Sequence, residues 1–371
     1  MYTENEIVRV AKRENNQKRK YLVVNVLQGK HVPVQPSKAL KMFGELAKII
    51  KRTYEGEKLL LIGFAETATA IGAAIAAKVD CHYIQTTREI IENVDYLFFS
   101  EAHSHATEQK LVKNDIAKVI NQIDRIIFIE DEVTTGNTIH NIITLLQQEY
   151  ASSSIKFSIA SIINGMDDIA EKRFFIEHIN LHYLVKTINA DYEEVSEHYR
   201  GDGTYHKANT NDINFEYSTE MLHGLVDARR VHKRVEYQNA YQELWMQIKQ
   251  NEKVNDSNNK DILVIGTEEF MYPALYVASM LESEGNNVRF HATTRSPIMV
   301  DLDKNYPLHE RFELRSFYDS ERITYLYDIK QYDKVFVITD SNNNLTAGCN
   351  SLLNALRLCG NENVKVIRWC E

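Results

Sequence analysis

A rhythm of short apolar runs, each followed by a turn and a segment of helix length, constrains the fold more than any other feature. Strands that alternate with helices need crossover connections, which place neighbouring strands parallel. The rhythm predicts a doubly wound, mostly parallel α/β sheet in the first half, with Ser37 as the N-cap of its first helix. The strands are expected at residues 21–27, 59–63, 82–84, 96–99, 125–129 and 154–163, and the helices at 37–51, 70–78 and 137–150.

The rhythm breaks between residues 187 and 258, where one helix is expected at 231–249, and it restarts at residue 261. After residue 261, three strand ends resemble three strand ends of the first half. The sequence separation of the matched positions differs by only a few residues, which loop insertions explain. The matched positions are Gly63 with Gly266, Arg88 with Arg295 and Asp131 with Asp340, at offsets of 203, 207 and 209 residues. The halves are therefore predicted to be related α/β domains. The alternative is that two unrelated doubly wound sheets share glycines and acids at their strand ends.

These patterns predict three parts of the chain. A first domain is expected at residues 1–200, a connecting segment at 201–258 and a second domain at 259–371. A chain of 371 residues is long enough for two domains of ordinary size.

Composition narrows the function classes. The chain carries 43 basic and 52 acidic side chains, a net charge of −9, and 44% of its residues are hydrophobic. This composition is typical of a globular protein. The negative charge argues against a general nucleic-acid binder, because such binders need a basic face. It leaves room for a local basic pocket that binds a small anion.

Cysteines and apolar stretches indicate the compartment. The four cysteines are too sparse for a disulfide scaffold. The longest stretch of small apolar residues, at 70–77, is far shorter than the ~20 residues of a membrane helix. The charged N-terminus does not resemble a secretory signal. We therefore expect a cytoplasmic protein with neither nucleic acid nor a membrane as its partner.

Residues 126–138 carry the strongest chemical signal. Four apolar residues precede Glu130 and Asp131, and a Thr-Thr-Gly-Asn-Thr loop then opens a helix. Free backbone N–H groups at a helix start favour phosphate, and Gly136 lets the backbone approach it closely. Carboxylates beside a phosphate site suit the hydroxyls of a sugar attached to that phosphate. The alternative is an acidic strand end that runs into a capped helix.

This segment resembles the 5-phosphoribosyl-1-pyrophosphate (PRPP) loop of the type I phosphoribosyltransferases. The resemblance implies that Glu130 and Asp131 contact the ribose hydroxyls, with Mg²⁺ bound to PRPP near this pair. It also implies that the loop holds the 5′-phosphate through Thr134, Thr135, Gly136, Asn137 and Thr138.

The resemblance also implies a site for pyrophosphate, the group that leaves PRPP in the reaction of this family. A pyrophosphate loop is expected at Gly63, Phe64, Ala65, Glu66 and Thr67, although Glu66 disfavours pyrophosphate unless Mg²⁺ intervenes. Arg88 occupies the place of a basic residue that neutralises pyrophosphate in that family. The alternative for Arg88 is a surface ion pair with Glu89.

Residues 99–110 correspond to a mobile loop that closes over the substrate in type I enzymes. There His103 and His105 are candidates to protonate or hold the leaving pyrophosphate, and Lys110 is a candidate to neutralise it. Two alternatives stay open. The His-x-His pair with nearby glutamates suits a metal such as zinc, and the whole segment suits a solvated loop.

Residues 291–298, HATTRSPI, look like the signature of the TRSP domain. That domain follows phosphoribosyltransferase domains in bacterial gene clusters associated with tellurite resistance and stress. The second half lacks one acid of the pair and the Thr-Thr-Gly loop, so we interpret it as a degenerate repeat that binds the acceptor, a second ligand or the first half. Its candidate ligand residues, expected at strand ends, are Gly266, Thr267, Glu268, Arg295, Asp340 and Ser341. The alternative for Arg295 is an ion pair with a neighbouring carboxylate.

Together these features predict an Mg²⁺-dependent phosphoribosyltransferase. It would displace pyrophosphate from C1 of PRPP with a nitrogen or another nucleophile of a small-molecule acceptor. The alternative is a non-catalytic PRPP or nucleotide sensor. The acceptor is unspecified, since the expected base-binding regions, 20–55 and 187–250, contain no diagnostic motif. The resemblance also favours a homodimer.

Overall fold

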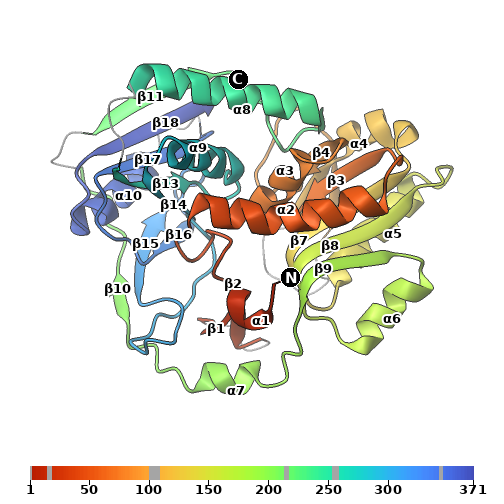
Figure 1. Ribbon diagram of the computed structural model, residues 1–371, viewed down its shortest axis with the longest axis horizontal. Helices are drawn as coiled ribbons and strands as arrows, with labels where there is room; N and C mark the ends of the chain where they lie inside the picture. The colour runs from red at the N-terminus through yellow and green to blue at the C-terminus, as the bar shows by residue number, and fades with distance from the viewer. Residues whose placement is uncertain (1, 15–18, 100–108, 213–216, 253–258, 342–345) are drawn as a thin grey trace. The chain divides into compact units, whose positions relative to one another are not determined.

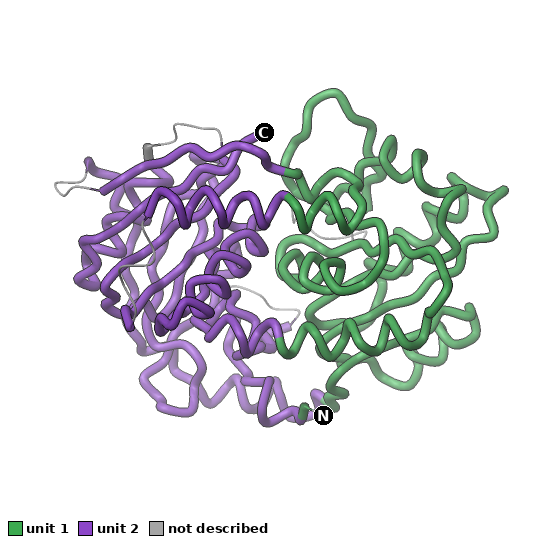
Figure 2. Tube along the Cα trace, turned by 45° about the horizontal axis from the view of Figure 1, so that its top comes forward, with its two compact units in different colours: residues 1–2, 41–188, 226–239 green, residues 3–40, 189–225, 240–371 purple. Residues whose placement is uncertain are grey.

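The computed structural model describes residues 2–14, 19–99, 109–212, 217–252, 259–341 and 346–371. The chain divides into two compact units, which Figure 2 shows in different colours. Unit 1 contains residues 1–2, 41–188 and 226–239, and unit 2 contains residues 3–40, 189–225 and 240–371.

This division differs from the boundaries predicted at residues 200 and 258. Residues 3–40 and 189–200, expected in the first domain, belong to unit 2. The reason is non-local backbone pairing. Strands β1 (Val8–Lys12) and β2 (Tyr21–Asn25) pair antiparallel, and bridges join Arg13 to Ile298 and Val34 to Phe290.

Unit 1 is built on a six-stranded sheet in the order β12-β4-β3-β7-β8-β9, parallel except for β12 (Figure 1). The strands are β3 (Leu59–Gly63), β4 (Cys81–Gln85), β7 (Arg125–Val133), β8 (Lys156–Asn164), β9 (Asn180–Lys186) and β12 (His232–Lys233). A separate antiparallel hairpin is formed by β5 (Tyr96–Phe99) and β6 (Gln109–Val112). The other elements are α3 (Thr69–Ala76), α4 (Lys113–Val119), η1 (Ile120–Gln122), α5 (Asn137–Glu149) and α6 (Asp168–Ile176).

Unit 2 has a five-stranded sheet in the order β11-β18-β17-β13-β14, with every pair parallel (Figure 1). Its strands are β11 (Ser218–His223), β13 (Asp261–Gly266), β14 (Asn287–Ala292), β17 (Lys334–Thr339) and β18 (Val364–Cys370). A smaller sheet joins β10 (Thr204–His206), β15 (Glu310–Arg315) and β16 (Ile323–Tyr327). The helices are α1 (Glu4–Ile7), α7 (Tyr192–Glu197), α9 (Tyr272–Ser283) and α10 (Thr346–Leu358).

Two long helices contribute residues to both units, namely α2 (Pro36–Thr53) and α8 (Arg234–Glu252). The predicted N-cap of the first of these helices is wrong. The helix begins at Pro36, so Ser37 lies inside it, and the Ser37 hydroxyl donates to Glu282 Oε1 at 2.9 Å. Within the described ranges, no helix has both the length and the apolar character of a membrane span.

The two units repeat one another in strand order and in individual hydrogen bonds. The order β4-β3-β7-β8 of unit 1 matches β14-β13-β17-β18 of unit 2. Thr86 N donates to Gly63 O at 2.9 Å, and the equivalent Thr293 N donates to Gly266 O at 3.0 Å. These matches are what a duplication predicts.

The hairpins repeat as well. In unit 1, Thr87 forms an antiparallel bridge with Lys110 of the β5–β6 hairpin, and in unit 2 the equivalent Thr294 forms one with Tyr325 of β16. Each unit therefore places a hairpin strand beside the residues that follow its outer parallel strand, β4 or β14. The chain thus consists of two α/β units with mostly parallel sheets, as its sequence predicts.

Candidate active site

The turn between β7 and α5 is shaped by Gly136. This residue is the N-cap of α5 and has φ +69°, a conformation that glycine adopts without strain. A Cβ atom here would lie 2.5 Å from a ring carbon of Phe174, so a side chain has no room. Gly136 offers no capping side chain, and the first N–H group of α5, that of Asn137, donates to Thr135 Oγ1 at 3.3 Å. The other N–H groups of the first turn point toward the start of the helix. Thr135 and Asn137, on either side of Gly136, are exposed.

Arg173 of α6 holds this turn in place. Its Nη2 donates to Thr135 O at 2.9 Å, and its Nη1 donates to Asn137 Oδ1 at 3.0 Å. Its guanidinium also lies 4.8 Å from the ring centre of Phe174. Sequence analysis missed Arg173, since nothing in the local pattern links it to a turn 36 residues earlier.

Replacing Arg173 with alanine should loosen the turn without disturbing the sheet. We expect KM for PRPP to rise about fivefold, the effect of losing about 1 kcal/mol of hydrogen bonding. Arg173→Lys should not rescue binding, because one ammonium cannot replace two nitrogens in a fixed fork. The exposed neighbour Lys172, changed to alanine, is the matched control. An unchanged KM in Arg173→Ala would contradict the role.

The acid pair lies within β7, near its carboxyl end, and beside the loop that follows β3, since the strand extends to Val133 and not only to residue 129 as predicted. Thr67 Oγ1 donates to Asp131 Oδ1 at 2.8 Å, and Phe64 N donates to Ile129 O at 3.1 Å. The structure therefore brings the predicted pyrophosphate loop against the predicted ribose-binding acids. Glu130 and Asp131 are both half-buried.

The electrostatic environment disfavours two ionised carboxylates at Glu130 and Asp131. Burial raises the pKa of the Glu130 carboxyl well above its ordinary value, and the charge of Asp131 raises it further. A positive ion would relieve this repulsion. Two carboxylates and the Thr67 hydroxyl supply oxygen donors of the kind that Mg²⁺ prefers, so the residues fit the predicted ion.

The raised pKa of Glu130 predicts a stability effect. Because folding disfavours its charged form, the folded state is destabilised increasingly as pH rises from the ordinary glutamate value, about 4.3, through the raised pKa. Glu130→Gln should therefore raise the melting temperature at pH 8 in the absence of ligand. The gain should vanish near pH 3, more than one unit below the ordinary glutamate value, where Glu130 is protonated in both states. Equal differences at both pH values in thermal melts would contradict this origin.

The loop after β3 contains residues with distinct roles. Gly63 is required by packing, since a Cβ atom there would lie 2.6 Å from Tyr83 Oη. Phe64 is buried, so any contact it makes with a ligand must come from its backbone. Ala65 N donates to Thr86 Oγ1 at 2.8 Å, and the buried Glu66 follows a cis peptide bond.

Two of the predicted cations lie at this edge. Lys110 Nζ donates to the carbonyl oxygens of Arg88 and Glu89, each at 3.4 Å, and Arg88 is half-buried. The strand that carries Lys110 bridges to Thr87, which follows β4. His103 and His105 lie outside the described residues. Among the residues that are described, no cluster of three or more His, Cys, Asp or Glu side chains is arranged to hold a metal.

Unit 2 brings its predicted residues to the equivalent edge. Thr267 Oγ1 is hydrogen bonded to Tyr318 OH at 2.7 Å, and Tyr318 OH donates to Asp340 Oδ1 at 2.6 Å. Ser341 is buried, and its hydroxyl donates to Phe317 O at 2.5 Å. Gly266 is required by packing, since a Cβ atom there would lie 2.7 Å from a backbone oxygen.

The carboxylate of Glu268 is enclosed by its own unit. Its Oε2 accepts from Arg295 Nε at 2.7 Å and from Arg322 Nη1 at 2.9 Å, and its Oε1 accepts from Ser316 Oγ at 2.5 Å. Glu268 N donates to Thr293 Oγ1 at 3.0 Å, as Ala65 N does to Thr86 in unit 1. The ion pair that was the alternative for Arg295 is therefore present.

Two known protein families match this chain, one in its first half and one in its second. A phosphoribosyl transferase family matches residues 7–189, and the TRSP domain that lies C-terminal to such transferases matches residues 223–356. No curated protein matches the sequence.

The chain is also similar to solved adenine phosphoribosyltransferases. The enzyme from Rhodothermus marinus is 14% identical, with a TM-score of 0.35, and the match covers 49% of this chain and 96% of that one. The enzyme from Thermoanaerobacter pseudethanolicus is 16% identical, with a TM-score of 0.35, and the match covers 49% of this chain and 97% of that one. The Trypanosoma brucei enzyme, solved with AMP, pyrophosphate and ribose-5-phosphate, is 13% identical, with a TM-score of 0.34, and the match covers 48% of this chain and 76% of that one.

Proposed function

We propose that this chain is a member of the two-domain family in which a TRSP domain follows a phosphoribosyl transferase domain, and that it transfers the phosphoribosyl group of PRPP to a small-molecule acceptor. The observation that supports this most is the hydrogen bond between Thr67 and Asp131. It joins the loop suited to pyrophosphate to the acids suited to ribose. The glycine-capped start of α5, suited to the 5′-phosphate, comes directly after β7, the strand that carries these acids.

Catalysis would depend on positioning and charge. The backbone of the turn and the hydroxyls of Thr134, Thr135 and Thr138 would hold the 5′-phosphate, and Glu130 and Asp131 would hold the ribose hydroxyls. The bond from C1 to the pyrophosphate oxygen breaks with its electron pair leaving on pyrophosphate, while a lone pair of the acceptor forms the new bond to C1. Such a transition state gains most from fixed geometry and from cations beside the leaving group.

The leaving pyrophosphate would be neutralised at the edge formed by β3 and β4. Arg88 and Lys110 supply positive charge there, and Lys110 is fixed by the carbonyl groups of residues 88 and 89. Mg²⁺, held with PRPP near Glu130 and Asp131, would add charge at the ribose hydroxyls and the pyrophosphate. His103 and His105 remain candidates for proton transfer.

Pyrophosphate release tests the proposal. Full-length protein with PRPP and Mg²⁺ should release pyrophosphate when a panel of nucleobases and other nitrogen nucleophiles contains the acceptor, with a phosphoribosylated product of matching mass. PRPP binding without release for any acceptor would instead favour the sensor. A homodimer and a role in tellurite resistance or stress are further predictions from the resemblance.

A further inference from the structure

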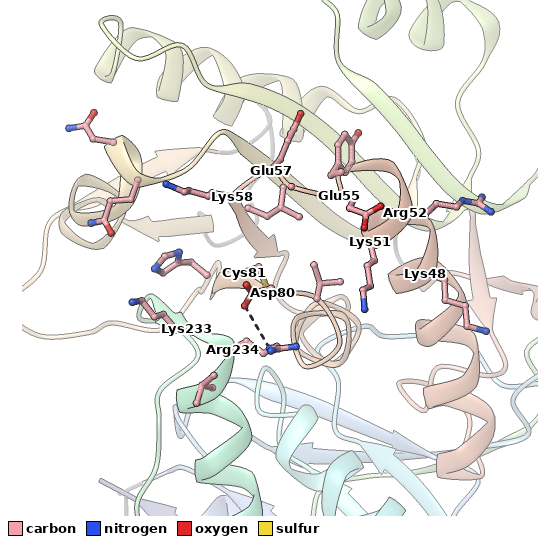
Figure 3. Close-up of a pocket in the computed structure, with 18 residues that line it drawn as sticks. Lys48, Lys51, Arg52, Glu55, Glu57, Lys58, Asp80, Cys81, Lys233 and Arg234 are labelled. Atoms are coloured by element: carbon pink, nitrogen blue, oxygen red, sulfur yellow. Dashed lines mark ion pairs between the residues drawn. The ribbon is translucent and has the colours of Figure 1, made fainter.

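A large cavity lies in unit 1 at the edge of the sheet opposite to the acid pair. Its volume is about 1070 Å³, and its lining includes Leu59 and Cys81, the first residues of β3 and β4. Figure 3 labels Cys81 among the charged residues of the lining. The acid pair lies toward the carboxyl end of β7, and β3, β4 and β7 are parallel. The cavity is therefore separate from the proposed PRPP site and plays no part in the mechanism above.

Basic side chains dominate the rim of this cavity. They come from the end of α2, the turn before β3, β12 and the start of α8. The basic residues are Lys48, Lys51, Arg52, Lys58, Lys233 and Arg234, and the acidic ones are Glu55, Glu57 and Asp80. The chain as a whole carries a net charge of −9, so a concave basic surface runs against its overall charge.

One of the three acids is already neutralised from outside the cavity. Glu57 accepts from Arg125 Nε at 2.6 Å and lies 3.3 Å from Lys156 Nζ. These contacts lower the pKa of Glu57, most strongly through the hydrogen bond from Arg125. Asp80 is 94% exposed, and its Oδ1 lies 3.9 Å from Arg234 Nε, beyond hydrogen-bond distance. The cavity therefore keeps a positive balance.

Several of the cations have no anion of their own in the described parts of the chain. Within the described residues, no ion pair is formed by four of the basic side chains, namely Lys51, Arg52, Lys58 and Lys233. The Nε atom of Arg234 is buried without a hydrogen-bond acceptor. Like charges gathered on a concave surface repel one another, and an anion bound among them would relieve that repulsion.

The residue types and the size of the cavity indicate the ligand class. Lysine ammonium groups bind phosphate as point charges, and arginine adds paired donors. The volume exceeds the need of a single phosphate and is close to the upper limit of small-molecule sites, about 1,000 Å³. Leu59, Val79 and Cys81 add an apolar floor. We propose that this cavity binds a small molecule that carries a polyphosphate, at a site distinct from that of PRPP.

The test is calorimetry on the full chain with two probes, ATP and inorganic tripolyphosphate, at low salt. Wild type should bind at least one of them. Equal affinities would show that the phosphates alone are recognised, and tighter binding of ATP would show that the nucleoside also contributes. Binding of neither probe would overturn the proposal.

Charge reversal locates the binding. The double variant Lys51→Glu/Arg234→Glu should lose affinity at least tenfold, and Lys58→Glu should lose part of it. Lys41→Glu, an exposed position on α2 outside the cavity, is the matched control and should bind as wild type does. Circular dichroism checks that each variant is folded. Wild-type affinity in both Lys51→Glu/Arg234→Glu and Lys58→Glu would overturn the proposal.

The PRPP site must be excluded as the source of the signal. Asp131→Asn should retain the affinity for the probes, because this residue lies at the opposite edge of the sheet. If Asp131→Asn lost affinity for the probes while Lys51→Glu/Arg234→Glu kept it, the probes would bind at the PRPP site, and this would contradict the proposal. The transferase function does not depend on this result.

Discussion

Asp131→Asn should lower PRPP-dependent pyrophosphate release at least tenfold. Asparagine keeps the shape of the side chain and an oxygen that can accept from Thr67, so the loop after β3 should stay in place. What is lost is the charge that would hold the ribose hydroxyls and Mg²⁺. Hydrogen bonds to a charged group contribute about 1.5–3 kcal/mol, and tenfold corresponds to about 1.4 kcal/mol.

The duplication supplies the matched control for this variant. Asp340 directly follows β17 in unit 2, as Asp131 lies near the end of β7 in unit 1, and it likewise accepts from a hydroxyl, that of Tyr318. Asp340→Asn should leave the affinity for PRPP within about twofold of wild type, the effect of roughly 0.5 kcal/mol. Equal losses of PRPP affinity in the two variants would contradict a ribose site at Asp131.

Gly136→Ala should destabilise unit 1 and disorder the turn between β7 and α5, where we propose that the 5′-phosphate binds. The left-handed conformation of Gly136 costs an alanine about 1–2 kcal/mol, and forcing its Cβ against Phe174 adds about 1–3 kcal/mol. The free energy of unfolding, measured by urea denaturation, should therefore fall by about 2–5 kcal/mol. PRPP binding should weaken as well.

A second glycine separates the two contributions. Gly285 has φ +90°, and a Cβ atom there would meet nothing within 4 Å. Gly285→Ala should cost only the conformational part, about 1–2 kcal/mol. If both variants lost the same stability, the contact with Phe174 would not be the reason for glycine at position 136.

Local patterns predicted part of both sheets. The rhythm of apolar runs located β3, β4, β7 and β8 of unit 1 and β13, β14 and β17 of unit 2, because each buried parallel strand is a short apolar run bounded by a turn. It did not locate β9, β11, β12 or β18. The strand order and shared hydrogen bonds agree with the repeat inferred from Gly63 and Gly266.

Features that depend on distant residues could not be predicted in this way. Arg173 reaches the turn from another helix, and residues 3–40 join unit 2 through bridges to positions far along the chain. The basic cavity assembles from α2, the turn before β3, β12 and α8. Phe64 looked like part of a ligand loop, but its ring packs in the core against Phe99 and Phe128.

The second unit indicates how many PRPP molecules the chain should bind. In unit 2, Glu268 lies in the segment that corresponds to the predicted pyrophosphate loop of unit 1. Its carboxylate binds Arg295 and Arg322. Arg295 also lies 3.6 Å from Glu269 and Arg322 lies 3.7 Å from Asp319, so both guanidinium groups are already neutralised by their own unit. We expect one PRPP per chain, in unit 1.

Calorimetric titration of PRPP with Mg²⁺ into the wild-type chain tests the central claim most directly. The account predicts binding of one PRPP per chain, and an affinity at least tenfold weaker in Asp131→Asn. Wild-type protein that is folded and yet binds no PRPP would contradict the transferase. Two equivalent sites per chain would contradict the assignment of the site to unit 1 alone.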